Sequence, residues 1–103
     1  KNFDPKRYFK DALFIRPGKP RKVVLVFTKS TEPFIRIRKF HDSQKTKKKR
    51  DGSIEVALRV PLEDELLYWI LSFGANVAVK EPVELQQRVE EELEKTLGQY
   101  KMK

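Results

Sequence analysis

Two kinds of hydrophobic pattern predict strands in this chain. The stretch KVVLVFT, residues 22–28, is apolar at consecutive positions and rich in β-branched residues, which is typical of a strand covered on both faces. Residues 53–60 alternate instead, so one face of that strand should be apolar and the other polar. The expected inward set is Ile54, Val56, Leu58 and Val60, and the expected outward pair is Glu55 and Arg59. Asp51-Gly52, a strong tight-turn signal, joins this strand to residues 44–50 and predicts a hairpin.

Three helices are predicted between residues 30 and 100. Ser30-Thr31-Glu32-Pro33 is a helix-start signal, and that helix should run to about Lys39 with Phe34 and Ile37 facing the core and Arg36 exposed. Residues 62–73 are apolar around most of a helical circumference, and Gly74 should end this second helix. After a short strand over residues 76–80, a final helix is expected over residues 82–100. Its narrow apolar stripe consists of Leu85, Val89, Leu93, Leu97 and Tyr100.

The order of these elements predicts the fold class. Residues 1–20 favour a connector, with a short helix from Asp4-Pro5 to about Leu13 that a cluster of Pro and Gly then ends. Residues 21–103 follow as strand, helix, strand, strand, helix, strand and an extra C-terminal helix. This is the split pattern of a ferredoxin-like α+β sandwich, βαββαβ, which we expect for a single domain of this length.

The charge of the chain is divided between its two halves. The net charge is +8, but residues 1–50 hold 17 Lys/Arg against 4 Asp/Glu, whereas residues 51–103 hold 6 against 11. A basic half can bind nucleic acid or another anionic ligand, and it can equally dock on an acidic surface, including that of a second copy. The chain has no cysteine, which excludes a disulfide framework and thiolate chemistry and is compatible with a cytoplasmic location. It also lacks an apolar run of the roughly 20 residues that cross a membrane, so no membrane partner is expected.

Candidate chemistry is sparse. His41 is the single histidine and has no metal-ligating partner at a useful spacing. Ser43 lies two residues away, but no motif suggests an activated hydroxyl. Paired carboxylates and glycine-rich phosphate loops are not recognisable either. We therefore expect a non-enzymatic protein without a metal or cofactor.

Several segments together resemble a known family. They are VVLVF (23–27), FHDSQ (40–44), DGS (51–53) and, above all, the string ELLYWILSFGANVAVKEPVELQQRVEEELEKTLGQY (65–100). The chain resembles WCX, the C-terminal extension of WYL-domain transcriptional regulators, and FDPKRYF (3–9) is similar to the passage from the WYL domain into that extension. The most specific part is WILSFGANVAVKEPVEL.

The resemblance implies that this chain is one module of a larger cytoplasmic regulator. The chain does not begin with methionine, in keeping with a fragment. In such regulators a winged helix-turn-helix domain binds DNA, a WYL domain senses a ligand, and the extension helps to build a homodimer. The implied partners are the WYL domain of the same or a partner chain, and DNA through the domain that would precede this one.

The segment from the first helix to the hairpin has two open interpretations. The resemblance makes Arg36, Arg38, His41, Ser43 and Gln44 candidates for a surface near the WYL domain or its ligand. Alternatively, His41, Ser43 and Gln44 hydrogen-bond the local backbone where the chain turns into the hairpin.

The basic run in the first arm of the hairpin departs from the family. Lys45, Lys47, Lys48, Lys49 and Arg50 leave only Thr46 uncharged where relatives alternate apolar and polar residues. One interpretation is an edge strand on which lysine discourages pairing with other chains. The other is direct contact with the phosphate backbone of nucleic acid.

Two features of the helices predict packing or a dimer contact. Tyr68 and Trp69 are adjacent, so one should enter the core while the other faces a second helix or a partner. The stripe of Leu85, Val89, Leu93 and Leu97 must either cover the domain's own sheet or pack against a second copy. A solvated face is the simplest interpretation of the glutamates of this helix, which are Glu84, Glu90, Glu91, Glu92 and Glu94.

Overall fold

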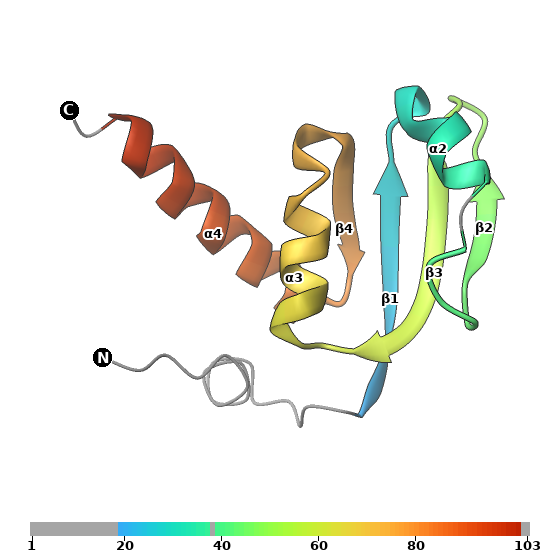
Figure 1. Cartoon of the computed structure of the whole chain (residues 1–103), viewed down its shortest axis with the longest axis horizontal. Coiled ribbons are helices and arrows are strands. Elements are labelled where there is room, and N and C mark those ends of the chain that lie inside the picture. Colours follow the sequence, from blue (N-terminus) through green and yellow to red (C-terminus); the bar gives the residue numbers. More distant parts are fainter. Residues whose placement is uncertain (1–18, 38, 102–103) are drawn as a thin grey trace.

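The computed structural model describes residues 19–37 and 39–101. Four strands form one antiparallel sheet in the order β2-β3-β1-β4 (Figure 1). They are β1 (Pro20–Phe27), β2 (Lys45–Lys48), β3 (Ile54–Pro61) and β4 (Val77–Glu81). The predicted helix over residues 4–13 lies outside the described residues, as does most of the connector.

Helices link the strands in the expected order. A 3-10 turn (Lys29–Thr31) and α2 (Glu32–Arg36) follow β1, whereas α3 (Asp64–Leu71) and a 3-10 turn (Gly74–Asn76) connect β3 to β4. Gly74 has φ of 58°, a left-handed conformation suited to glycine where the chain leaves the helix. The long helix α4 (Val83–Lys101) comes last. Because β1 and β2 flank β3 and both run antiparallel to it, the ferredoxin-like α+β prediction is confirmed.

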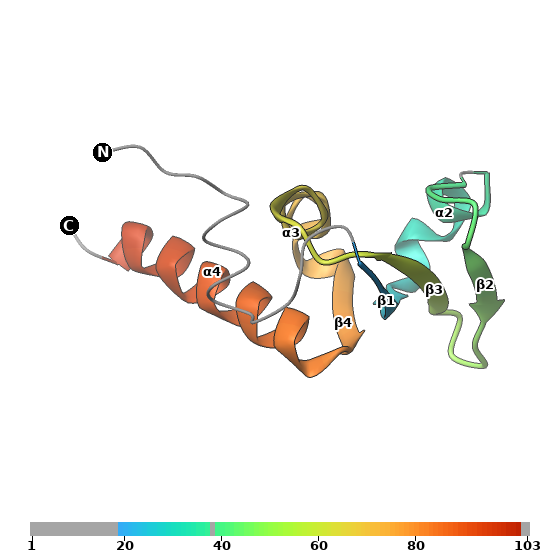
Figure 2. The same ribbon diagram turned by 90° about the horizontal axis from the view of Figure 1, so that it is seen from below.

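The helices lie unevenly around the sheet. Figure 2 shows α2 and α3 on one face, while α4 extends away from the edge formed by β4. The inward residues of β1 and β3 pack with Ile35, Leu62, Ile70, Val79 and Leu85 in the core. These inward residues are Val23, Leu25 and Phe27 of β1 and Ile54, Val56 and Leu58 of β3. The three from β3 belong to the set that the alternation in residues 53–60 predicts, and the fourth member of that set, Val60, is partly buried against the core. The opposite face, which we call the open face, carries the intervening residues.

The first helix departs from its prediction. It ends at Arg36, and Ile35 rather than Phe34 or Ile37 is its buried residue. Phe34 is 40% exposed and Ile37 77% exposed. A preceding 3-10 turn delays the helix start to Glu32, and Ile37 is already its non-helical C-cap. A helix of five residues therefore presents only one side chain fully to the sheet.

Candidate functional site

The loop from Lys39 to Gln44 is held by its own polar side chains. Gln44 Oε1 accepts a hydrogen bond from the Phe40 N–H at 2.6 Å. Ser43 Oγ accepts from the Arg59 N–H at 2.8 Å, and two possible acceptors for its own proton lie nearby, His41 Nδ1 at 2.8 Å and the Arg59 carbonyl oxygen at 3.3 Å. This hydroxyl therefore extends the pairing of the hairpin beyond the end of β2.

His41 takes part in the same loop network. The Ser43 N–H donates to His41 Nδ1 at 3.1 Å, and the Ser43 hydroxyl lies 2.8 Å from the same nitrogen. The expectation that His41, Ser43 and Gln44 bond the local backbone matches these contacts, which give all three side chains a structural role.

Three hollows surround this loop and separate the residues proposed to lie near a WYL domain. The first hollow, of about 390 Å³, lies between α2 and β2 and brings Arg36 together with Gln44 and Lys48. Arg36 Nε is 2.9 Å from Glu32 Oε2, so a carboxylate already partners this cation. Arg38 lies outside the described residues.

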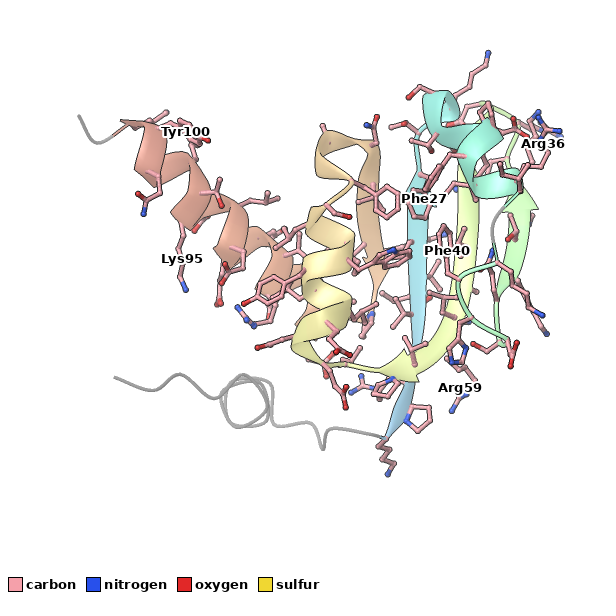
Figure 3. The ribbon with its side chains drawn as sticks, in the orientation of Figure 1. Phe27, Arg36, Phe40, Arg59, Lys95 and Tyr100 are labelled. Atoms are coloured by element: carbon pink, nitrogen blue, oxygen red, sulfur yellow. The ribbon has the colours of Figure 1, made fainter. Side chains whose placement is uncertain are left out.

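The second hollow, of about 290 Å³, contains His41 and is bounded by aromatic and acidic residues. Phe40 and Trp69 line it with Glu63 and Glu65, and the two aromatic ring centroids are 4.8 Å apart. Phe40 lies over the sheet in Figure 3, within an aromatic cluster that also includes Phe34 and Phe73. With two carboxylates at its rim, this hollow is suited to an apolar or cationic group and not to an anion.

The third hollow, also of about 290 Å³, lies on the open face of the sheet. Lys22, Lys45 and Arg59 line it together with Ser43, Ala57 and Leu58. Figure 3 shows Arg59 at the opposite end of the sheet from Arg36, so the basic residues of this region do not converge on one site. Sequence reasoning missed Lys22 and Arg59 as site residues. The signal was the outward position of Arg59, but its pairing with Lys22 depends on the register between β3 and β1.

The basic run occupies the sheet edge and divides between two faces. All four residues of β2 are exposed. Thr46 and Lys48 stand opposite the core residues Val56 and Ile54, whereas Lys45 and Lys47 stand opposite Ala57 and Glu55 on the open face. β2 is therefore an edge strand with lysines on both faces of the sheet, and its cations do not form a single row on one face.

The turn of the hairpin is fixed by Asp51 and Gly52. The Asp51 carboxylate accepts from the Ser53 N–H at 2.9 Å and from the Ser53 hydroxyl at 2.6 Å. These hydrogen bonds lower the pKa of Asp51. Gly52 has φ of 90°, and an added Cβ would meet Lys29 Cδ at 2.8 Å, so only glycine fits this position. Beside the turn, Lys49 Nζ lies 3.8 Å from Glu55 Oε1, which leaves Arg50 as an exposed cation of the turn.

The aromatic pair of α3 is divided as expected. Trp69 is half-buried and packs against the core, with its ring centroid 5.2 Å from that of Phe73. Tyr68 is 53% exposed on the outer side of the helix. Phe73 also meets Phe27 at 5.0 Å in an edge-to-face arrangement, which ties the end of α3 to β1.

The start of α4 is bound to the domain by apolar and charged side chains. Leu85 is fully buried and Val89 packs against the core. Arg88 is buried, and its Nη1 lies 3.4 Å from Glu92 Oε2 and 3.6 Å from Glu91 Oε1. Asp64, the buried first residue of α3, has a raised pKa because burial disfavours its charged form, an effect that Arg88 partly offsets.

The end of α4 has no such cover from the described residues. Leu93 is 49% exposed, Leu97 53% and Tyr100 73%. These three side chains continue the stripe begun by Leu85 and Val89, but the helix has by then passed the edge of the sheet (Figures 1 and 3). We call Leu93, Leu97 and Tyr100 the distal stripe.

The described residues show no group of three or more His, Cys, Asp or Glu placed to hold a metal ion. Nor does any helix among them have the length and apolar character needed to cross a membrane.

Comparison with known proteins assigns the family. No curated protein matches the chain. The family model described as the WCX domain matches residues 19–97, which span the sheet, α2, α3 and most of α4. That match points to a regulatory domain. This chain belongs to the WCX domain family.

Proposed function

We propose that this chain is a non-enzymatic assembly module of a WYL-type transcriptional regulator, in which the distal stripe of α4 pairs with a second copy. The family assignment supports a regulatory role. The exposure of Leu93, Leu97 and Tyr100 is the observation that carries the assembly role. Residues at these spacings lie on one side of a helix, and exposed apolar clusters of this kind mark interaction surfaces.

The charges along α4 favour an antiparallel pair of helices. Four glutamates lie between Glu90 and Glu94, whereas Lys95 and Lys101 lie toward the C-terminal end. A parallel pair would place the glutamates of both copies together, while an antiparallel pair places the lysines of one copy beside the glutamates of the other. Such a twofold contact is self-complementary, as in most homodimers.

In the regulator, this module would connect ligand sensing to DNA binding. A ligand event in the WYL domain of the same or the partner chain would change how that domain packs on this module. The paired modules would then change the relative position of the two DNA-binding domains. This coupling requires two distinct arrangements of the interface with different ligand affinities.

Disulfide cross-linking tests the proposed pairing, because the chain has no cysteine of its own. We expect a mixture of the Leu93→Cys and Leu97→Cys variants to form more mixed disulfide than either variant forms with itself. The Gln87→Cys variant is a matched control at an exposed position near the start of the same helix. Cross-linking at 93 and 97 no greater than in this control would contradict the proposal.

A second candidate function is direct contact between the basic hairpin, residues 45–50, and the phosphate backbone of nucleic acid. The exposure of all four residues of β2 at the sheet edge favours it. Fluorescence titrations with single-stranded and duplex oligonucleotides across a range of salt test this candidate. Affinity that is undetectable at low salt, or that is unchanged when Lys47, Lys48 and Lys49 become alanine, would exclude it.

A further inference from the structure

We propose that the third hollow, on the open face of the sheet, is a binding site for a phosphate group held by Lys22, Lys45 and Arg59. These three cations come from β1, the start of β2 and β3, and the sheet brings them together although they are far apart in the sequence. Lys22 stands directly opposite Arg59, and Lys45 stands opposite Ala57. Since Ala57 and Arg59 point to the same face, Lys45 is also the diagonal neighbour of Arg59.

Lys22, Lys45 and Arg59 are free of ion pairs within the part of the chain that the structure describes, although Glu55 stands on the same face two residues from Ala57. Glu55 instead contacts two nearby cations, Lys49 and Lys80. Like charges directly opposite each other on a sheet are destabilising. The Lys22 and Arg59 pair therefore repels itself in the absence of a ligand, and an anion between the two side chains would convert this repulsion into attraction.

The shape and chemistry of the hollow fit a compact anion. Ala57 is a small side chain on the same face as the three cations, and it lines with them a depression of about 290 Å³. Arg59 can offer paired N–H donors to two oxygens of one phosphate, and the two lysines can add point charges from the other sides. A single carboxylate would leave part of this positive charge unmatched.

The surroundings indicate how a nucleic acid would be held if it supplied the phosphate. The residues of β1 and β4 on this face are aliphatic or charged, such as the buried Val24 and the more exposed Val26 and Ala78, and they offer no aromatic platform for stacking bases. Lys47 continues the row of cations along β2 on the same face. A nucleic acid would therefore be bound through its phosphates with little base preference.

Heteronuclear NMR titration of the chain at low ionic strength tests the site. Inorganic phosphate, single-stranded oligothymidylate and a mixed-sequence DNA duplex serve as separate probes. We expect saturable shifts of the Lys22, Ser43, Ala57 and Arg59 amides with at least one probe. Shifts with inorganic phosphate alone would assign the site to small phosphorylated ligands, and shifts with an oligonucleotide would assign it to a phosphodiester backbone. No shift at these amides with any probe would overturn the proposal.

Two charge-matched variants separate the hollow from a general charge effect. The Lys22→Gln, Lys45→Gln, Arg59→Gln variant should weaken binding by about tenfold or more at low salt. The Lys29→Gln, Arg36→Gln, Lys39→Gln variant removes the same charge from exposed positions outside the hollow and outside α4, and it should change affinity much less. Equal losses in both variants would contradict a defined site.

A third variant distinguishes the hollow from the basic hairpin. Lys47→Gln, Lys48→Gln, Arg50→Gln again removes three charges and leaves the hollow intact. If this variant loses as much binding as the variant of the hollow, the hairpin candidate survives and the present proposal fails. Oligomeric state does not enter any of these measurements, so their outcome is independent of the assembly role of α4.

Thermal unfolding provides a readout that does not need a macromolecular ligand. At constant ionic strength, replacing chloride by phosphate should raise the Tm of the unmodified chain more than that of the variant of the hollow. Arg59→Gln alone should raise the Tm in chloride, because it removes the repulsion from Lys22. Two results together would contradict the site. They are a lower Tm in chloride for Arg59→Gln than for the unmodified chain, and an equal rise in Tm with phosphate for the unmodified chain and the triple variant of the hollow.

Discussion

The two ends of α4 carry the same hydrophobic stripe in different surroundings. At the start of the helix Leu85 is fully buried and Val89 packs on the core, whereas Leu97 and Tyr100 near its end are 53% and 73% exposed. The spacing of the stripe does not change along the helix, but the sheet beneath it ends. The difference shows that one continuous pattern can be buried against its own domain at one end and exposed at the other, and our proposal assigns the exposed end to a second copy.

The largest loss of stability should come from a substitution at the buried start of α4. Leu85→Ala should lower the free energy of unfolding by about 2–5 kcal/mol, because it leaves a cavity beneath α4. Leu97→Ala, the same substitution at the exposed end, should change it by less than about 0.5 kcal/mol under conditions where the chain is monomeric. Urea denaturation of both variants measures the contrast, and similar losses would show that the two ends are not differently packed.

The next largest loss of stability should come from Arg88, a buried cation of α4 whose charge acts on the buried Asp64 of α3. Arg88→Ala should destabilise the chain by about 1–3 kcal/mol, since it leaves the neighbouring buried carboxylate of Asp64 without a compensating cation. The loss should be smaller in an Asp64→Asn background, where no such charge remains. Equal losses in the two backgrounds, measured by urea denaturation, would show that the two side chains are not coupled.

The pH dependence of stability gives a second test of the environment of Asp64. Because the pKa of Asp64 is raised above its ordinary value of 3.8, the folded chain binds more protons at this group than the unfolded chain does as pH rises from that value. The contribution of Asp64 to the free energy of unfolding therefore falls as pH rises through its folded pKa. Asp64→Asn should gain stability relative to the unmodified chain from pH 3.8 upward. A difference that stays constant with pH would contradict a raised pKa.

The smallest expected effect on folding belongs to the distal stripe. Leu93→Gln, Leu97→Gln should leave the thermal unfolding of the monomer nearly unchanged, because both side chains are half exposed and glutamine is a good helix former. Thr96→Ala, Gln99→Ala is the matched control on the same part of the helix. A large drop in Tm for the stripe variant at low protein concentration would place these leucines in the fold of the monomer.

The sequence predicted the order of the elements and the hairpin because those depend on local patterns. Alternation in residues 53–60 and the Asp51-Gly52 turn each specify structure within a few residues. The edge position of β2 also followed from its lysines. The buried face of α2 was predicted wrongly, because a 3-10 turn shifts the helix start and Ile35 takes the place expected for Phe34 and Ile37.

The sites were less predictable because they depend on contacts between distant segments. The hollow on the open face combines Lys22, Lys45 and Arg59 through the register of three strands, which no local pattern specifies. The sequence also could not show which part of α4 is buried, because the apolar stripe is continuous. The length of the sheet decides where the stripe becomes exposed. The candidates Arg36, His41 and Ser43 lie in three separate hollows, although they are close in the chain.

Sedimentation equilibrium across a wide range of protein concentration is the most direct test of the assembly role of α4. We expect the chain to associate reversibly into dimers, and we expect Leu93→Gln, Leu97→Gln to remain monomeric at concentrations where the unmodified chain and the Thr96→Ala, Gln99→Ala control are dimeric. If the chain and the proposed full-length regulator both stay monomeric at high micromolar concentration, or if the stripe variant dimerises as strongly as the control, the assembly role of α4 is contradicted.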